Sequence, residues 1–214
     1  MAKLRYGIMG GTFNPIHYAH FFIANEVLEM FNLDKVLFIP TGVSPHKKTN
    51  SIDSYHRLSM VKLAIQDNPN FLVSDMEVLN PEVSYSVDTM TMLKMEHPNI
   101  EFYFIAGTDS VLNVGKWKNP HELMKLCNFV CVNRPGYTDD IQTEIEKLTD
   151  EFGGKIYSVN GPRLFVSSTM VRRRVNEHRT IKYLIPEKVL EYIEKNKLYL
   201  EDNNDLKGEK IEQR

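Results

Sequence analysis

Short runs of β-branched and aromatic residues alternate along the chain with longer stretches in which apolar residues recur at helical spacing. The short runs predict strands at residues 4–9, 36–40, 71–74, 101–106, 129–133 and 155–159. The longer stretches predict helices at residues 18–30, 54–66, 87–96, 120–126, 141–148 and 186–195, and a further helix that opens at 167–169. This alternation predicts an α/β fold, a doubly wound and mostly parallel sheet with helices on both faces.

Capping residues and apolar spacing indicate where the helices begin. Ser54 is the expected N-cap of the second helix, and Asn119 is the expected cap of a helix whose first residue is Pro120. The first helix has four apolar residues near helical spacing, which are Phe22, Val27, Met30 and Phe31.

The chain has 214 residues, of which 42% are hydrophobic and 25% are charged, the composition of an ordinary globular protein. We expect a single domain over residues 1–200, with a C-terminal helical part from about residue 167. The segments whose composition favours disorder are residues 41–53 and the charged tail at 201–214.

Several classes of protein are excluded by simple features of the chain. No apolar run approaches the roughly 18 to 20 residues of a membrane span, and the first ten residues lack the apolar core of a secretory signal. The two cysteines, Cys127 and Cys131, are too few for a disulfide scaffold and suit a reducing compartment. We therefore expect a cytoplasmic protein with no membrane partner, in which both cysteines belong to the core.

The charge balance argues against a binder of polyanions. The formal net charge is −2, and the tail at 201–214 holds five acidic and three basic residues, so residues 1–200 carry 23 of each. Nucleic-acid-binding proteins usually carry a basic excess, and the short run VRRRV at 171–175 does not provide one. We expect no nucleic acid partner, and any anion site must rely on a local positive field.

The segment GGTFNPIHYAH (residues 10–20) lies between the first predicted strand and the first predicted helix. Glycines at such a turn let backbone N–H groups approach a phosphate, and the helix end favours negative charge. His17 and His20 face the same side of the first helical turn, where two imidazoles can donate hydrogen bonds to charge that develops during transfer. The alternatives are a tight turn with two incidental surface histidines and a zinc site, for which no further ligand is evident nearby.

Two better-known phosphate-binding motifs do not fit. The glycines at 7, 10 and 11 do not match G-x-G-x-x-G, which argues against a hydride-transfer dehydrogenase. Gly107 and Gly115 have the wrong spacing for a P-loop, and Trp117 stands where that motif needs Ser or Thr.

Strand counting brings further residues toward the glycine-rich loop. In a sheet ordered 3-2-1-4-5, the first and fourth strands are neighbours at the switch point, where ligands bind. We therefore expect Gly10 and Gly107 to converge on one crevice, with Asp109 placed to bind ribose hydroxyls. A second anion site is expected where 167–169 opens a helix carrying Arg172, although these residues also suit a capped helix with surface arginines.

The residues at 10–20 resemble the nucleotidylyltransferase superfamily, whose signature is a glycine-rich loop followed by H-x-G-H, and within it the bacterial nicotinate-nucleotide adenylyltransferases. The pattern of that family is GGTFDPxHxGH, so Asn14 stands in place of Asp and Ala19 in place of Gly. Further matches are SPHK (44–47), SYHRLSM (54–60), SYSVDT (84–89), GTDS with KW (107–110, 116–117), RPG (134–136) and SSTMVR (167–172). The resemblance covers about residues 4–200.

The resemblance implies a Rossmann-like nucleotidylyltransferase fold and a reaction in NAD biosynthesis. The AMP part of ATP would be joined to the 5′-phosphate of nicotinate mononucleotide, which gives deamido-NAD and pyrophosphate. The mononucleotide phosphate would attack the α-phosphorus directly, so catalysis is positioning and charge stabilisation without a protein nucleophile. Mg²⁺ is expected to arrive with ATP, held mostly by phosphates and water, and we identify no dedicated metal ligands.

The resemblance also assigns roles to individual residues. The expected catalytic residues are His17, His20, Lys47 and Arg172. The expected ATP-binding residues are Gly10, Gly11, Thr12, Phe13, His17, His20, Gly107, Asp109, Ser167, Ser168, Thr169 and Arg172. The residues expected to bind nicotinate mononucleotide are Thr41, His46, Lys47, Tyr85, Ser86, Thr89, Trp117, Lys118 and Arg134. Trp117 would stack on the nicotinate ring, and the helix start at 85–89 would hold its carboxylate.

Two other functions remain open at this point. One is a member of the same superfamily with another acceptor, such as phosphopantetheine, or a relative that uses CTP. The other is a nucleotide-sensing or nucleotide-binding module without turnover. Homo-oligomerisation is also left open.

Overall fold

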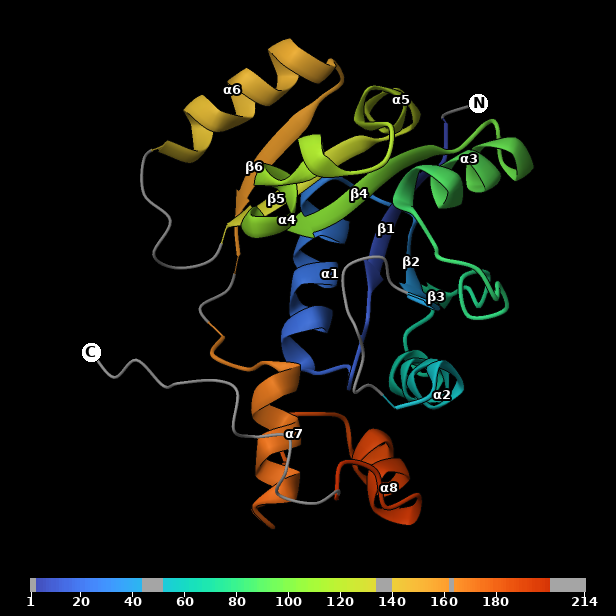
Figure 1. The fold of residues 1–214 in the computed structure, drawn as a ribbon, viewed down its shortest axis with the longest axis vertical. Coiled ribbons are helices and arrows are strands. Elements are labelled where there is room, and N and C mark those ends of the chain that lie inside the picture. Colours follow the sequence, from blue (N-terminus) through green and yellow to red (C-terminus); the bar gives the residue numbers. More distant parts are fainter. Residues whose placement is uncertain (1–2, 44–51, 134–139, 162–163, 201–214) are drawn as a thin grey trace.

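The computed structural model describes residues 3–43, 52–133, 140–161 and 164–200. Its centre is a six-stranded sheet in the order β3-β2-β1-β4-β5-β6, in which all paired neighbours are parallel (Figure 1). The strands are β1 (Arg5–Gly11), β2 (Lys35–Pro40), β3 (Phe71–Val73), β4 (Glu101–Gly107), β5 (Asn128–Asn133) and β6 (Ile156–Asn160). The order expected for the first five strands is confirmed, and β1 and β4 are neighbours.

Helices cover both faces of the sheet. They are α1 (Tyr18–Met30), α2 (Ser54–Ile65), α3 (Ser86–Glu96), α4 (Thr108–Leu112), α5 (Pro120–Leu126), α6 (Asp140–Phe152), α7 (Ser168–Asn176) and α8 (Glu187–Lys195), with a 3₁₀ helix, η1, at Val114–Lys116. Buried residues of α1, α2, α7 and α8 share one hydrophobic cluster with the sheet, and those of α3, α4, α5 and α6 share the other. The predicted doubly wound α/β architecture is therefore confirmed.

The inner strands are apolar because neither of their faces meets water. In β4 the four consecutive residues Phe102–Ile105 are buried, two toward each helical layer. Cys127 and Cys131 are buried and form no disulfide, as expected of core residues. No helix in the described part of the chain is long and apolar enough to span a membrane.

One expected helix cap is wrong, and another is confirmed in position but does not cap through its side chain. The N-cap of α2 is Asp53, whose carboxylate accepts a hydrogen bond from the Tyr55 backbone N–H at 2.8 Å, and Ser54 is the first helical residue. Asn119 precedes α5 as expected, with Pro120 at the first position, but it adopts a left-handed conformation (φ 47°) and its side chain caps nothing. Its carbonyl oxygen instead accepts the first helical hydrogen bonds.

Two of the four apolar residues that indicated the buried face of the first helix, Val27 and Phe31, do contact the core, and two do not. Its buried residues are Ala19, Ala24 and Val27, whereas Phe22 and Met30 are 45% and 55% exposed. Other large side chains of α1, those of Phe21, Ile23 and Leu28, pack against the core cluster in their place. The short helices α4 and η1 were not predicted, because residues 108–116 contain too few residues to show helical periodicity.

Candidate active site

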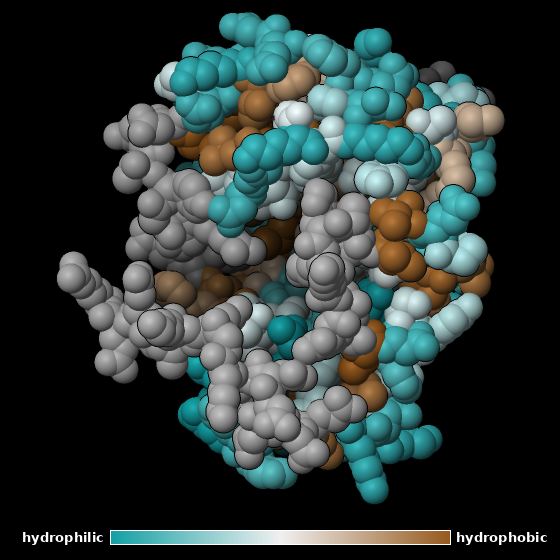
Figure 2. All heavy atoms as spheres, in the orientation of Figure 1, coloured by the Kyte–Doolittle hydropathy of each residue, from teal (hydrophilic) through white to brown (hydrophobic). Residues whose placement is uncertain are grey.

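A cavity of about 880 Å³ lies at the carboxyl ends of β1, β2, β4 and β5. Figure 2 shows a hollow in the corresponding face of the molecule, with both apolar and polar atoms on its floor. Gly10 and Gly11 at the end of β1 line the cavity together with Gly107 at the end of β4. The convergence expected from strand counting is therefore observed, at the switch point of the sheet.

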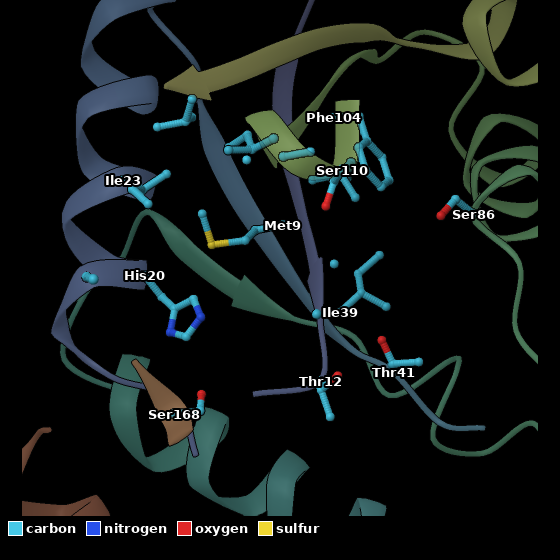
Figure 3. Close-up of a pocket in the computed structure, with 18 of the residues that line it drawn as sticks. Met9, Thr12, His20, Ile23, Ile39, Thr41, Ser86, Phe104, Ser110 and Ser168 are labelled. Atoms are coloured by element: carbon cyan, nitrogen blue, oxygen red, sulfur yellow. The ribbon is translucent and has the colours of Figure 1, made fainter. Parts of the chain in front are cut away.

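Three helices begin at this cavity, so their N-terminal residues line it. They are α1 with His17 and His20, α3 with Ser86, and α7 with Ser167 and Ser168. In Figure 3, His20 and Ser168 lie on one side of the pocket and Ser86 lies on the opposite side. Neither α1 nor α7 has an acidic residue in its first turn. The dipoles of both helices and the N–H groups at the start of α7 therefore favour an anion in the space between them.

The glycine-rich loop turns sharply between β1 and α1, and a buried aromatic ring holds the turn. Phe13 is a non-glycine residue with a positive φ of 47°, a conformation that costs about 1 kcal/mol or more. Its ring is 3% exposed and packs against His20 and Phe38, with ring centroids 5.1 and 5.9 Å apart. Phe13 therefore supports the loop from the core and does not line the cavity.

His17 and His20 form a stacked pair of imidazoles whose centroids lie 3.8 Å apart. The backbone N–H of His17 donates to Nδ1 of His20 at 3.2 Å. Because Nδ1 of His20 acts as an acceptor, the ring proton of this histidine lies on Nε2. His20 projects from α1 toward the pocket, so it offers an N–H donor to a bound anion (Figure 3).

The opposite wall is aromatic and carries two cations, Lys116 and Lys118. Trp117 lines the cavity and meets Phe104 edge to face, with ring centroids 5.9 Å apart. The ammonium group of Lys118 lies 4.6 Å from the centroid of the Tyr85 ring and 2.8 Å from the Asp88 carboxylate. A flat ring beside the start of α3 suits a planar heterocycle that bears a negative substituent.

Three polar residues in or behind the walls of the cavity were given no role of their own by sequence reasoning. Glu77 lines the cavity, accepts a hydrogen bond from the Thr89 hydroxyl at 2.7 Å, and has a pKa raised mainly by burial, against the effects of Thr89 and of the positive charge of Arg57. Arg57 is 2% exposed and donates to the carbonyl oxygens of Thr12 and Gly42 at 2.7 and 3.3 Å. Burial lowers its pKa.

Ser84 is the third of these residues. It lines the cavity just before α3, and its buried hydroxyl has no hydrogen-bond partner within the described residues. A close approach explains the glycine at position 42 nearby, because a Cβ there would overlap the carbonyl oxygen of Glu77. In the sequence, Arg57 stands within the family match at 54–60, but nothing marked it as a contact of the loop.

Most of the residues expected at the site do line the cavity. They are Gly10, Gly11, Thr12, His17, His20, Thr41, Tyr85, Ser86, Thr89, Gly107, Trp117, Lys118, Ser167 and Ser168. The expected residues that do not line it are Phe13, Asp109, Thr169 and Arg172. Asp109 is exposed in the first turn of α4, where the next residue, Ser110, lines the cavity. The expectations for His46, Lys47 and Arg134 fall outside the described residues, as do most of 41–53 and the whole tail.

The helical part after residue 164 reaches the glycine-rich loop. Arg172 Nη1 donates to the carbonyl oxygen of Asn14 at 2.8 Å, and the Ser168 hydroxyl donates to that of Pro15 at 2.8 Å. The Tyr199 hydroxyl donates to Asn14 Oδ1, also at 2.8 Å.

The described residues contain no group of three or more His, Cys, Asp or Glu side chains that could hold a metal ion. The site therefore offers hydrogen-bond donors and cations to a substrate.

The fold and this site define a nucleotidylyltransferase-type α/β protein, and the family model described as cytidylyltransferase-like matches residues 8–174. A relative from Thermoanaerobacter sp. (strain X514), named probable nicotinate-nucleotide adenylyltransferase, is 45% identical over 203 residues, which cover 94% of this chain and 96% of the relative. A relative of the same name from Clostridium novyi (strain NT) is 40% identical over 195 residues, 90% of this chain and 98% of the relative. The chain belongs to the nicotinate-nucleotide adenylyltransferase family.

Solved structures support the fold independently. The nicotinic acid mononucleotide adenylyltransferase of Plasmodium falciparum complexed with NaAD superposes with a TM-score of 0.76, at 24% identity over 93% of this chain and 98% of that chain. The same Plasmodium falciparum enzyme complexed with APC gives a TM-score of 0.74, at 24% identity over 94% of this chain and 99% of that chain. At this identity the likeness shows the shared fold.

Proposed function

We propose that this protein transfers the adenylyl group of ATP to nicotinate mononucleotide, which gives nicotinate adenine dinucleotide (deamido-NAD) and pyrophosphate in NAD biosynthesis. The observation that carries the proposal is one cavity that is lined by the glycine-rich loop, the His17–His20 pair and Trp117. Three helices begin at this cavity. Family membership supports the same reaction. The donors on one side suit polyphosphate, and the aromatic wall on the other suits the pyridine ring.

The reaction needs no covalent intermediate with the protein. An oxygen of the mononucleotide 5′-phosphate attacks the α-phosphorus of ATP, the bond from that phosphorus to the bridging oxygen breaks, and pyrophosphate leaves with the electron pair. His20 donates from Nε2 to a phosphate oxygen whose negative charge grows in the transition state, and His17 supports it from the stacked position. Mg²⁺ accompanies ATP as part of the substrate, and we assign it no protein ligand.

The ATP contacts at the start of α7 come from backbone groups. The Ser168 hydroxyl hydrogen is already donated to the Pro15 carbonyl, so Ser167 and Ser168 serve the β- and γ-phosphates through N–H groups at the start of α7. Arg172 and Thr169 lie at the edge of this site, and the role of Arg172 in phosphate binding rests on the family motif. Asp109 is proposed for the ribose on the same basis.

The mononucleotide is held between α3 and the aromatic wall. Trp117 stacks on the pyridine ring, and the backbone N–H groups at Ser86 and the cation of Lys118 attract the carboxylate. Thr89 donates its hydroxyl to Glu77, so it supports the start of α3 and leaves carboxylate binding to the backbone. His46, Lys47 and Arg134 are proposed contacts from the family motifs alone.

The decisive experiment is a turnover assay with purified protein, MgATP and a panel of acceptors. We expect pyrophosphate release and the dinucleotide product with nicotinate mononucleotide, and slower turnover with nicotinamide mononucleotide, which lacks the carboxylate. Phosphopantetheine as acceptor and CTP as donor serve as controls for the other superfamily activities. Turnover with either of these and not with nicotinate mononucleotide would overturn the proposal, as would tight binding of both substrates without product.

A further inference from the structure

Side chains from three distant parts of the fold hold the turn at residues 12–15 of the glycine-rich loop. Arg57 of α2 binds the Thr12 carbonyl at 2.7 Å, and Arg172 of α7 binds the Asn14 carbonyl at 2.8 Å. The third contact is the hydrogen bond from the Tyr199 hydroxyl to Asn14 Oδ1, between residues 185 positions apart. These three side chains and Asn14 are not among the residues that line the cavity in the described part of the chain. Arg57, Tyr199 and Asn14 therefore act on the loop without lining the space that substrates would fill, and Arg172, which is proposed above to bind phosphate, also holds the loop.

Tyr199 is built into this cluster as a hydrogen-bond donor. The side chain of Asn14 is 7% exposed, so its amide oxygen depends on protein donors. Burial raises the pKa of the Tyr199 hydroxyl, against the smaller effects of Arg172 and Arg57, so the hydroxyl keeps its proton at physiological pH. Asn14 stands where the family pattern has Asp, and an amide oxygen accepts from a phenol as a carboxylate does, without placing a negative charge there.

We propose that Tyr199 is a positioning residue of the active site, which acts through Asn14 to hold the glycine-rich loop in its reactive geometry. Asn14 lies between Thr12 and His17, two residues that line the cavity. A displacement of Asn14 therefore moves a backbone contact of ATP and an imidazole of the transfer site together. Because a shift of about 1 Å in a reacting geometry can cost about a hundredfold in rate, a single distant hydroxyl can affect turnover. The inference rests on the proposed adenylyl transfer.

The test compares two hydroxyl deletions in the same C-terminal part of the chain. Tyr199→Phe removes the hydrogen bond to Asn14 and keeps the ring. Tyr192→Phe is the matched control, because its hydroxyl also bonds a distant side chain, Nδ1 of His56 at 2.9 Å, but one that does not touch the loop. We expect Tyr199→Phe to lower kcat about tenfold while the KM for ATP changes less than about threefold, and Tyr192→Phe to change kcat less than about twofold. Equal kcat values for the two variants would overturn the proposal.

A second pair of variants approaches the contact from the loop. Asn14→Ala removes the acceptor, so the double variant with Tyr199→Phe should turn over no more slowly than Asn14→Ala alone. If the two losses instead multiply, Tyr199 does not act through Asn14 and the proposal fails. This pair also decides the matter if Tyr199→Phe folds poorly, because Asn14→Ala should then reproduce the split between kcat and KM.

Amide hydrogen exchange tests the same contact without any activity. In Tyr199→Phe, peptides covering residues 10–17 should exchange severalfold faster than in the wild type or in Tyr192→Phe, whereas peptides from β5 should be unchanged. Unaltered exchange in the loop would overturn the positioning role. If the wild-type protein fails to turn over nicotinate mononucleotide, the proposed function fails, and the exchange result still decides whether Tyr199 holds the loop.

Discussion

At the scale of single residues, His20 has a fixed tautomer and lies in the first turn of α1, where it lines the cavity. Its Nδ1 is occupied by the His17 backbone N–H, so Nε2–H is the donor that faces the cavity. We expect His20→Ala to lower kcat by roughly a hundredfold, as the loss of one transition-state donor does elsewhere. The measurement is steady-state pyrophosphate release, with circular dichroism to verify the fold. His97→Ala, at an exposed site after α3, is the control, and a loss below about threefold for His20→Ala would remove it from the catalytic residues.

Replacement of Trp117 should weaken the binding of one substrate and leave the binding of the other nearly unchanged. It lines the cavity beside Lys118, and in sequence it is far from the glycine-rich loop. We expect Trp117→Ala to raise the KM for nicotinate mononucleotide roughly five- to tenfold and to leave the KM for ATP within about twofold, because ring stacking acts on one substrate. Trp117→Phe keeps a flat face and should recover most of the affinity. Equal increases in both KM values would contradict the stacking role.

Glu77 makes a pH-dependent contribution to stability whose sign follows from its burial. The pKa of this carboxyl is raised above the ordinary value of 4.5, so the folded state holds its proton more tightly than the unfolded state does. Ionisation of Glu77 in the folded state lowers the free energy of unfolding. This loss is absent below about pH 4.5 and is fully present once the pH exceeds the folded pKa. Stability therefore falls across that window as the pH rises.

Replacement by the neutral amide removes this part of the pH dependence. We expect the stability of Glu77→Gln relative to wild type to shift in favour of the variant between pH 4 and pH 8, whatever constant offset the loss of charge beside Arg57 introduces. Urea denaturation at both pH values measures the shift, and Glu82→Gln at an exposed position is the control. A shift of the opposite sign would mean that Arg57 outweighs desolvation.

At the scale of elements, the start of α2 provides a direct test of which residue caps a helix. Asp53 accepts the Tyr55 N–H, whereas Ser54 already belongs to the helix. Asp53→Ala should therefore lower the free energy of unfolding by about 1 kcal/mol, and Ser54→Ala should change it by a few tenths. Chemical denaturation of both variants makes the comparison. The reverse order would show that the serine is the functional cap in solution.

Elements with strong local signals could be predicted from the chain alone. The strand order, the turn at residues 10–20 and the convergence of Gly10 with Gly107 follow from periodicity, glycine chemistry and strand counting. Contacts whose partners lie far apart in sequence gave no such signal. The bond from Tyr199 to Asn14 joins a residue after the last helix to a turn before the first one, and no spacing rule connects them.

The amphipathic pattern also failed to identify some of the residues that the fold buries. In α1 the large apolar residues Phe22 and Met30 suggested the core face together with Val27, but they are largely exposed, whereas Ala24 and Val27 are buried in the core. Glu77 and Arg57 are charged and would ordinarily be placed at the surface. Arg57 is buried and Glu77 is partly buried, and their hydrogen bonds to backbone carbonyls and to Thr89 form only in the assembled fold.

At the scale of the whole molecule, the path of the chain explains how the site is assembled. After α1 and α2 cover one face of the sheet, α3 to α6 cover the other, and α7 and α8 return to the first face (Figure 1). This return places Ser168, Arg172 and Tyr199 against the loop at residues 14–15, so the last part of the described chain holds the loop beside the cavity. A site built from both ends of the chain forms only when the entire fold is complete.

The reactivity of the two cysteines can measure whether the fold is complete, because both lie in the core shared by α3, α4, α5 and α6. Burial raises the pKa of Cys127 to about 12 and also raises the pKa of Cys131, so at pH 8 almost no thiolate is present to react. We expect the native protein to be inert to a disulfide reagent and both thiols to become reactive at the urea concentration where circular dichroism is lost. Cys131→Ala leaves one thiol and identifies which residue reacts. Modification of either thiol well before that midpoint would show that this helical layer opens separately from the rest of the fold.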